Sequence, residues 1–137
     1  MVENLRQVQA SLPKASAKQV RFVLITLDPV SDTPETLRAF RAEHRLSSEN
    51  WFLLRGSPSM VRSMADQLGY GFHSNSQGGF DHDSLITVLG AQGDTLFRTA
   101  SLTGGTDRVA TCLRTAILTT KSESAIDSNL VQNPTPR

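Results

Sequence analysis

Cysteine is the first residue type that the sequence has little of. A single cysteine, Cys112, occurs among 137 residues. An internal disulfide is therefore impossible, and a thiolate-rich metal site within one chain is excluded. For the same reason, cysteine usage gives no sign of the redox compartment.

Long hydrophobic runs and an excess of charge of one sign are lacking as well. The longest apolar run is FVLITL at 22–27, far short of the roughly 20 residues that a membrane helix needs. The opening MVENLRQVQA does not have the basic-then-apolar order of a signal peptide. Charged residues make up 20% of the chain and the formal net charge is +1. We therefore expect no nucleic-acid partner and no membrane segment in this chain.

What the sequence does contain is an alternation of helix and strand patterns. The spacing of Leu5, Val8 and Leu12 predicts a helix over 2–12, and the continuous apolar run predicts a strand over 21–27 that is covered on both faces. The later expected elements are a helix over 34–45, a strand over 51–56, a helix that Ser57 caps and Gly69 ends, a loop over 71–83, a hairpin over 84–99 and a helix from Thr106 or Asp107 to about Leu118. From Thr119 on, the polar composition predicts a disordered tail over 119–137. The order of elements predicts an α/β fold, and its second half suits a thioredoxin-like fold.

The turn LDPVSDT follows the predicted strand at 21–27 and places two acids, Asp28 and Asp32, at its carboxyl end. Ligands of α/β proteins often bind at this place, so one interpretation is an aspartate-dependent phosphoryl-transfer site. The spacing of the acids is wrong for such enzymes, and no glycine-rich phosphate loop accompanies them. The other interpretation, which we favour, is that Asp28 bonds backbone amides of the turn while Asp32 or Thr33 caps the next helix.

The histidines and the cysteine are the other candidates for chemistry. His82 lies in FDHDS between Asp81 and Asp83, and a neighbouring carboxylate can orient a metal-binding imidazole. From these residues alone a loop histidine without a role is the more common case. His44 and His73 carry less signal. Cys112 falls on the apolar stripe of the last predicted helix, which is typical of a buried cysteine that packs as a small hydrophobe.

Three blocks of the sequence, in order, resemble the Sco/SenC family of thioredoxin-like copper chaperones for cytochrome oxidase assembly. The first is VRFVLITLDPVSDTPETLRAF, which is similar to the family's apolar strand, D-P-x-x-D-T-P turn and helix; the matching residues here are Asp28, Pro29, Asp32, Thr33, Pro34 and Leu37. The others are NWFLLRGSPSMVRSMADQLG and FDHDSLITVLGAQGDTLFR. The resemblance covers about residues 2–115. It implies that His82 is a copper ligand, that Asp28, Asp32 and Asp81 support the site, and that an oxidase subunit or assembly factor is the partner.

One departure from the family pattern is large. The family binds copper with the histidine and two cysteines in a C-x-x-x-C motif, and this sequence has no such motif. The opening helix resembles the continuation of the helix that begins with that motif, so we expect an incomplete thioredoxin-like domain over 1–118 that lacks the first strands and the start of the first helix. Without the preceding central strand, the strand at 21–27 would pair elsewhere or stay separate from the hairpin at 84–98.

Three hypotheses follow. The first is a Sco/SenC-like protein whose parent role is copper delivery or thiol maintenance, with tight copper binding impaired because the two cysteine ligands are absent. The second is a non-catalytic, thioredoxin-like interaction module. The third is the phosphoryl-transfer enzyme. No complete catalytic motif is present, so a metallochaperone-like protein is favoured over an enzyme. The resemblance implies a membrane-tethered location on the periplasmic or intermembrane side.

Overall fold

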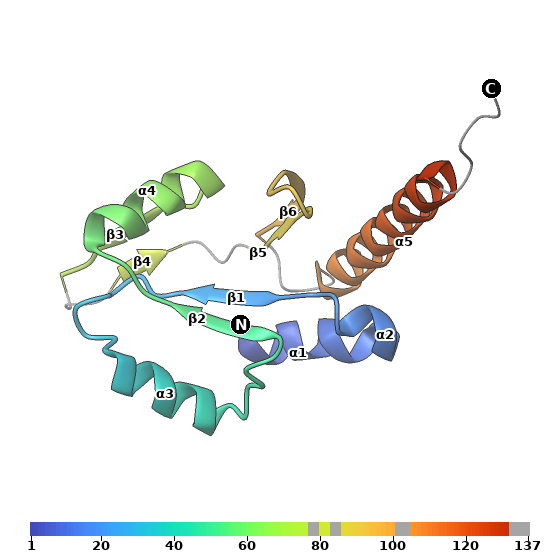
Figure 1. Cartoon of the computed structure of the whole chain (residues 1–137). Coiled ribbons are helices and arrows are strands. Elements are labelled where there is room, and N and C mark those ends of the chain that lie inside the picture. The colour runs from blue at the N-terminus through green and yellow to red at the C-terminus, as the bar shows by residue number, and fades with distance from the viewer. Residues whose placement is uncertain (77–79, 83–85, 101–104, 132–137) are drawn as a thin grey trace.

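The computed structural model describes residues 1–76, 80–82, 86–100 and 105–131, and it has the α/β architecture that the sequence predicts. Figure 1 shows the elements in chain order: α1 (Val2–Ser11), α2 (Lys14–Ala17), β1 (Phe22–Ile25), α3 (Pro34–Glu43), β2 (Trp51–Leu54), α4 (Pro58–Leu68), β3 (Phe72–Ser74), β4 (Phe80–His82), β5 (Ile86–Leu89), β6 (Thr95–Thr99) and α5 (Gly105–Val131). Helices and strands alternate from α2 to α4, and two antiparallel strand pairs and a helix follow in the described part.

Capping residues that can be recognised in the sequence set the ends of α3 and α4. Thr33 accepts a hydrogen bond from the Thr36 N–H at the start of α3, and Ser57 accepts one from the Met60 N–H at the start of α4. A proline occupies the first turn of both helices, where its missing N–H costs nothing. Gly69 ends α4 with φ of 65°, a backbone conformation that glycine adopts without strain. The predicted starts of α3 and α4 and the end of α4 are confirmed.

The strands form three separate two-stranded sheets in the described part of the chain. β1 and β2 are parallel, with Phe22 opposite Trp51. β3 pairs antiparallel with β4, and β5 pairs antiparallel with β6. The strand near 21–27 was expected to pair elsewhere or to stay separate from the hairpin; among these residues β1 pairs with β2 and with no strand of the hairpin.

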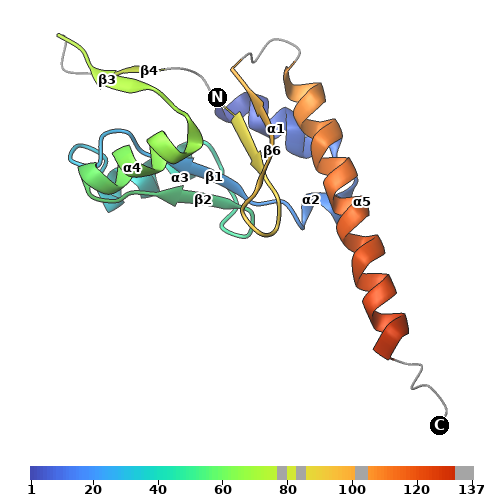
Figure 2. The same cartoon turned by 90° about the horizontal axis from the view of Figure 1, so that it is seen from above.

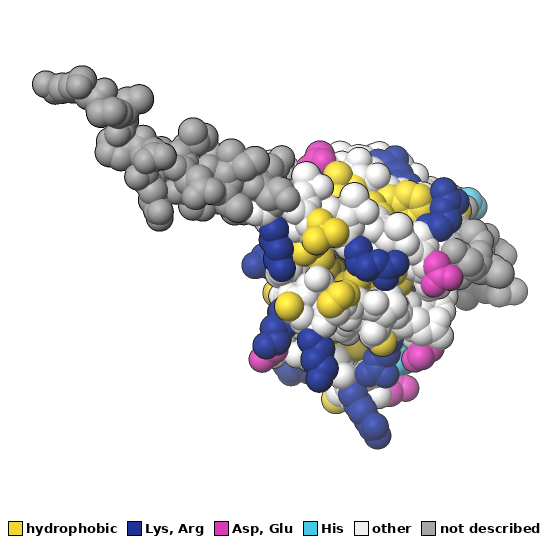
Figure 3. Space-filling model, turned by 90° about the vertical axis from the view of Figure 1, so that its right-hand side faces the viewer, with side chains coloured by type: hydrophobic (Ala, Val, Ile, Leu, Met, Phe, Trp, Pro, Cys, Tyr) yellow, Lys and Arg dark blue, Asp and Glu magenta, His cyan; other side chains and the backbone are white. Residues whose placement is uncertain are grey.

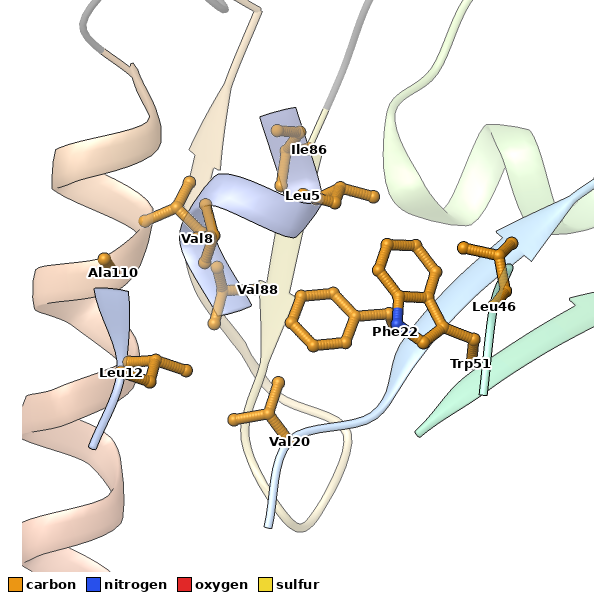
Figure 4. Packing of buried hydrophobic residues seen from close by; sticks show 11 residues of the cluster. Leu5, Val8, Leu12, Val20, Phe22, Leu46, Trp51, Ile86, Val88 and Ala110 are labelled. Carbon is orange, nitrogen blue, oxygen red and sulfur yellow. The ribbon is translucent and has the colours of Figure 1, made fainter. Parts of the chain in front are cut away.

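One hydrophobic core joins elements that share no sheet. Leu5 and Val8 of α1, Phe22 of β1, Val88 of β5 and Ala110 of α5 belong to the same cluster, and Figure 4 shows their side chains converging. The remaining buried members are Leu12, Val20, Leu46, Trp51, Ile86 and Val109. This core holds the β1–β2 sheet, the β5–β6 hairpin and two helices together, although no strand ladder joins the two sheets within the described residues.

A smaller apolar cluster lies under α4. Val61 and Ala65 of that helix pack against Phe72 of β3, and the guanidinium of Arg62 lies 4.9 Å from the Phe72 ring centroid. Figures 1 and 2 place α3 and α4 on opposite faces of the β1–β2 sheet. Val23 of β1 is 48% exposed. The expectation that this strand is covered on both faces was therefore too simple.

Two segments differ from the sequence-based expectation. The stretch 71–83, expected as a loop, contains β3 and β4, because Phe72 and His82 lie opposite each other in an antiparallel pair that a local glycine-rich pattern does not reveal. The last helix continues to Val131, although we expected its end near Leu118 and a disordered chain from Thr119. No proline or glycine interrupts the sequence after Gly105 until Pro134, so nothing local stops the helix. The division into a domain over 1–118 and a tail over 119–137 stays a prediction.

The face in Figure 3 shows how charges and apolar groups are distributed on one side of the molecule. Lys and Arg side chains are spread over this face among small groups of hydrophobic side chains, with fewer acidic ones between them. No helix in the described residues has the length and apolar composition that crossing a membrane requires.

Candidate functional site

The acidic turn begins where β1 ends, and Asp28 organises it. The Asp28 carboxylate accepts hydrogen bonds from the backbone N–H groups of Val30, at 3.3 Å, and Ser31, at 3.1 Å. The Asp28 carbonyl accepts from the Asp32 N–H at 2.9 Å. These bonds satisfy three amides of one tight turn, the role that the sequence favoured for Asp28.

Asp32 is tied to the strand rather than to the next helix. Its carboxylate accepts a hydrogen bond from the Thr26 hydroxyl, and the same Thr26 oxygen accepts from the Asp28 N–H at 3.0 Å. Thr33, not Asp32, is the cap of α3. Thr26 therefore connects both acids, and sequence reasoning missed it because nothing in a strand-end threonine marks it as a partner of an acid six residues later.

Arg55, just beyond β2, holds the other side of the turn. Its guanidinium donates to the Pro29 carbonyl. The residue also borders a shallow groove of about 290 Å³ between α3 and β2, which is lined by Pro34, Leu37, Arg38, Arg41, Leu53 and Arg55. The guanidinium of Arg41 donates to the carbonyls of Leu46 and Trp51, at 3.2 and 2.9 Å. Arg55 therefore contacts the turn itself, through the Pro29 carbonyl, whereas Arg41 links α3 to Leu46 and to Trp51 of β2.

The hydrogen bonds around Asp28 also change its acidity. The side-chain hydrogen bond with Ser31 is the largest contribution, and with the backbone bonds it lowers the pKa of Asp28 from the ordinary 3.8. A carboxyl whose pKa is lower in the folded than in the unfolded state adds stability above its unfolded value, and that stability is lost as the pH falls through the folded value.

We therefore predict that the stability difference between the wild type and Asp28→Asn shrinks as the pH falls below 3.8. Urea unfolding followed by circular dichroism, at about pH 6 and about pH 3, measures the difference. Ser31→Ala, which removes the side-chain donor, should weaken the pH dependence without abolishing it. An Asp28→Asn difference that does not vary between the two pH values would contradict this account.

The candidate copper ligand His82 lies in β4, opposite Phe72, and Asp81 lies opposite His73. Only the backbone positions of these two residues are described; their side chains lie outside the described part of the chain, as does Asp83. The loop position expected for His82 is wrong, because the residue belongs to a strand. Its role as a metal ligand, and the supporting role of Asp81, stay predictions.

The two other histidines have structural surroundings. His44 is the last residue associated with α3, its ring centroid lies 4.3 Å from that of Phe40, and its carbonyl accepts from Arg6. His73 is exposed on β3. Among the described residues, no three side chains of His, Cys, Asp or Glu come together in a way that could hold a metal ion.

Cys112 lies on the core side of α5, where it packs against the main cluster beside Leu113. Burial raises the pKa of the Cys112 thiol above the ordinary 9.0. A raised pKa keeps the sulfur protonated near neutral pH, whereas a metal ligand or nucleophile must be a thiolate. These surroundings fit the packing role that the helix pattern predicted.

Comparison with known proteins identifies similar folds. The family model described as SCO1/SenC matches residues 1–118. A SCO1/SenC family lipoprotein from Bacillus anthracis is 19% identical with a TM-score of 0.73, and the match covers 85% of this chain and 70% of that one. A putative electron transfer protein from Aquifex aeolicus is 20% identical with a TM-score of 0.71, covering 83% and 66%. Arabidopsis thaliana ScoI, solved with copper bound, is 19% identical with a TM-score of 0.62, covering 82% and 73%. No curated protein matches the chain. The thioredoxin-like fold expected from the sequence is confirmed.

Proposed function

Because the chain belongs to the SCO1/SenC family, we propose that its role derives from copper delivery or thiol maintenance during cytochrome oxidase assembly. The match over residues 1–118 carries this proposal. Two further observations support it: one structurally similar ScoI was solved with copper bound, and the acidic turn of the family pattern has a hydrogen-bonded, braced geometry here. The proposed partner is an oxidase subunit or an assembly factor.

Copper, the cargo in this role, does not fit the donor atoms that this chain supplies. Copper(I) prefers soft thiolates, and the single thiol, that of Cys112, is packed on α5 with a raised pKa. No metal-binding group of three side chains occurs within the described ranges. We therefore propose that residues 1–137 by themselves bind copper(I) weakly, with His82 as the one candidate ligand that the family pattern assigns.

A competition titration of the chain against a chromogenic copper(I) chelator tests this. The expected result is that copper stays with the chelator and that Cys112→Ser and His82→Ala behave like the wild type. Stoichiometric binding with a sub-micromolar Kd would refute the proposed impairment. If that binding were lost in His82→Ala but kept in Cys112→Ser, it would establish His82 as a ligand of this chain.

A second candidate function is a non-catalytic interaction module. The observation that favours it is a continuous core, in which Val8 is 1% and Trp51 2% exposed, combined with a β1–β2 sheet that has two strands in the described part of the chain. The phosphoryl-transfer alternative remains third. Its two acids each accept hydrogen bonds from the turn or the strand, which leaves them engaged in shaping the backbone.

A further inference from the structure

The shallow groove between α3 and β2 has a charge pattern that goes beyond the proposed copper-related role and does not depend on it. Its volume is about 290 Å³, and its lining residues are Pro34, Leu37, Arg38, Arg41, Leu53 and Arg55. We propose that this groove docks an acidic peptide segment of a partner protein that also carries aliphatic side chains. Three observations carry the proposal: a local excess of positive charge, guanidinium groups that are held in place, and apolar residues that line the rest of the groove.

The positive charge of the groove is a local feature, because the chain as a whole is nearly neutral. The sequence holds 14 Lys and Arg against 13 Asp and Glu, a formal net charge of +1. Three of the lining residues are arginines and none is acidic. Within the described part of the chain, Arg38 is the one lining arginine in an ion pair, with Glu35 at 3.0 Å, and both side chains are 70% exposed. Because exposed pairs of this kind are weak, the groove keeps positive charge that an acidic ligand can pair with.

Arg41 and Arg55 are held at the groove by backbone carbonyl groups. The Arg41 guanidinium donates to the carbonyls of Leu46 and Trp51, and the Arg55 guanidinium donates to the Pro29 carbonyl. A carbonyl is neutral, so these bonds fix the position of each cation without cancelling its charge. A guanidinium has five N–H donors, so donors remain for a carboxylate. Since the side chains have less freedom left to lose, binding an acidic group costs less entropy.

The other lining residues make the groove suitable for aliphatic side chains. Leu37 of α3 and Leu53 of β2 are half-buried, and Pro34 lies in the first turn of α3. Burial of apolar surface supplies binding free energy that charges close to water do not supply. A concave site with both kinds of side chain therefore suits a peptide with acidic and leucine-like residues. An anionic membrane suits it less well, because a flat lipid surface does not enter a groove.

The groove is built by elements that contact one another directly, and it lies apart from the candidate metal ligand. Its lining residues all fall between positions 34 and 55. Arg41 of α3 bonds to Trp51 of β2, and β2 pairs with β1 over its whole length. Figure 1 shows β1 between β2 and the β5–β6 hairpin, with α3 on the β2 side. The same view places β4, which carries His82, on the other side of the β1–β2 sheet. Changes in the groove can therefore be tested separately from copper binding.

The test uses the full chain and short synthetic peptides that are acetylated and amidated. The probe has the sequence Glu-Leu-Glu-Leu-Glu-Leu. One control peptide has glutamine in place of every glutamate, and the other has serine in place of every leucine. A ¹H–¹⁵N NMR titration measures the affinity and shows whether the amide signals of Leu37 and Leu53 shift. We expect these signals to shift and the probe to bind at least about tenfold more tightly than either control. Its affinity should fall as the salt concentration rises.

Arg38→Gln combined with Arg55→Gln is the matched protein variant, because both side chains are exposed and border the groove. Lys14→Gln combined with Lys18→Gln is its control. That control removes the same charge from exposed positions of α2 and its C-terminal end, which Figures 1 and 2 place away from α3. We expect the arginine variant to bind the probe at least about tenfold more weakly than the wild type, and the lysine variant to bind it equally well. Circular dichroism shows whether both variants are folded.

Glu35→Gln is expected to change the affinity in the opposite direction. It removes the carboxylate that pairs with Arg38, so the probe should bind about twofold more tightly. If the arginine variant fails to fold, Glu35→Gln and the three peptides on the wild type decide. The proposal would be overturned by equal binding of the glutamate and glutamine peptides, by no binding of any peptide, or by an equal loss in the arginine and lysine variants. Binding of phosphatidylserine vesicles in place of the probe would overturn it as well.

Discussion

Trp51→Ala is expected to remove a large part of the stability of the fold. The side chain of Trp51 is 2% exposed and stacks on Phe22, with ring centroids 4.7 Å apart and an interplanar angle of 18°. Truncating a buried tryptophan costs about 3–5 kcal/mol, and domains of ordinary stability have about 5–15 kcal/mol in total. The expected loss is therefore at least about a fifth of the total and can approach all of it.

The large effect has a structural reason beyond the buried area. Trp51 lies on β2, its ring contacts Phe22 of β1, and its Nε1–H donates to Gln9 Oε1 of α1 at 3.1 Å. The residue thus connects the two strands of the parallel sheet to the first helix. Losing it leaves a cavity at the junction of three elements and an unpaired amide oxygen on Gln9.

Urea unfolding followed by far-ultraviolet circular dichroism measures this prediction, because Trp51 is the single tryptophan and its fluorescence would be absent from the variant. Trp51→Phe is the matched control, since it keeps an aromatic ring against Phe22 and removes the Nε1–H bond. We expect it to lose much less, about 1–2 kcal/mol. A Trp51→Ala protein within about 1 kcal/mol of the wild type would show that the β1–β2 sheet does not depend on this contact.

Val8→Asp is the second prediction with a large effect. Val8 of α1 is 1% exposed and packs into the main cluster, which also includes Val109 and Ala110 of α5. An isolated carboxylate placed there has no cation in the cluster to pair with. Unpaired buried charges are among the few causes of destabilisation above about 4 kcal/mol. We expect the variant to be largely unfolded at neutral pH.

The pH dependence of Val8→Asp has a definite sign. Burial raises the pKa of a carboxyl group, so the unfolded state loses its proton first as the pH rises. The destabilisation therefore grows as the pH rises from the unfolded value, about 4, and is greatest above the raised folded value. Gln7→Asp, on the exposed side of the same helix, is the control and should unfold near the wild-type urea concentration. Similar unfolding midpoints for both variants at neutral pH would mean that α1 does not dock on this core.

These two experiments also bear on the functional alternatives. A single cooperative transition in the wild type, abolished by a change in either α1 or β2, would show that residues of both elements fold as one unit. An interaction module requires such a unit. Weak copper(I) binding together with cooperative folding would favour the module, whereas tight copper(I) binding would favour the copper role for this chain itself.

Part of the hydrogen bonding in the acidic turn could be predicted from the sequence, and part could not. The D-P-x-x-D-T-P pattern predicted a turn after a buried strand, a role for Asp28 in bonding backbone amides, and a cap at Asp32 or Thr33. The structure has all of these features, with Thr33 as the cap. The bond between Thr26 and Asp32 and the brace from Arg55 to Pro29 were not predictable. They depend on how the strand end and β2 are placed in space, which no local pattern records.

The sequence by itself determined the local secondary structure, which depends on residues close together along the chain. Capping residues, prolines in first turns, Gly69 and the apolar periodicities act within a few residues, so they placed α1, β1, α3, β2 and α4 and identified the family. The tertiary structure alone decided the pairing of β3 with β4, the parallel pairing of β1 with β2 and the exposure of Val23. Those features arise from contacts between residues far apart in sequence, where packing and backbone hydrogen bonding across elements outweigh local preference.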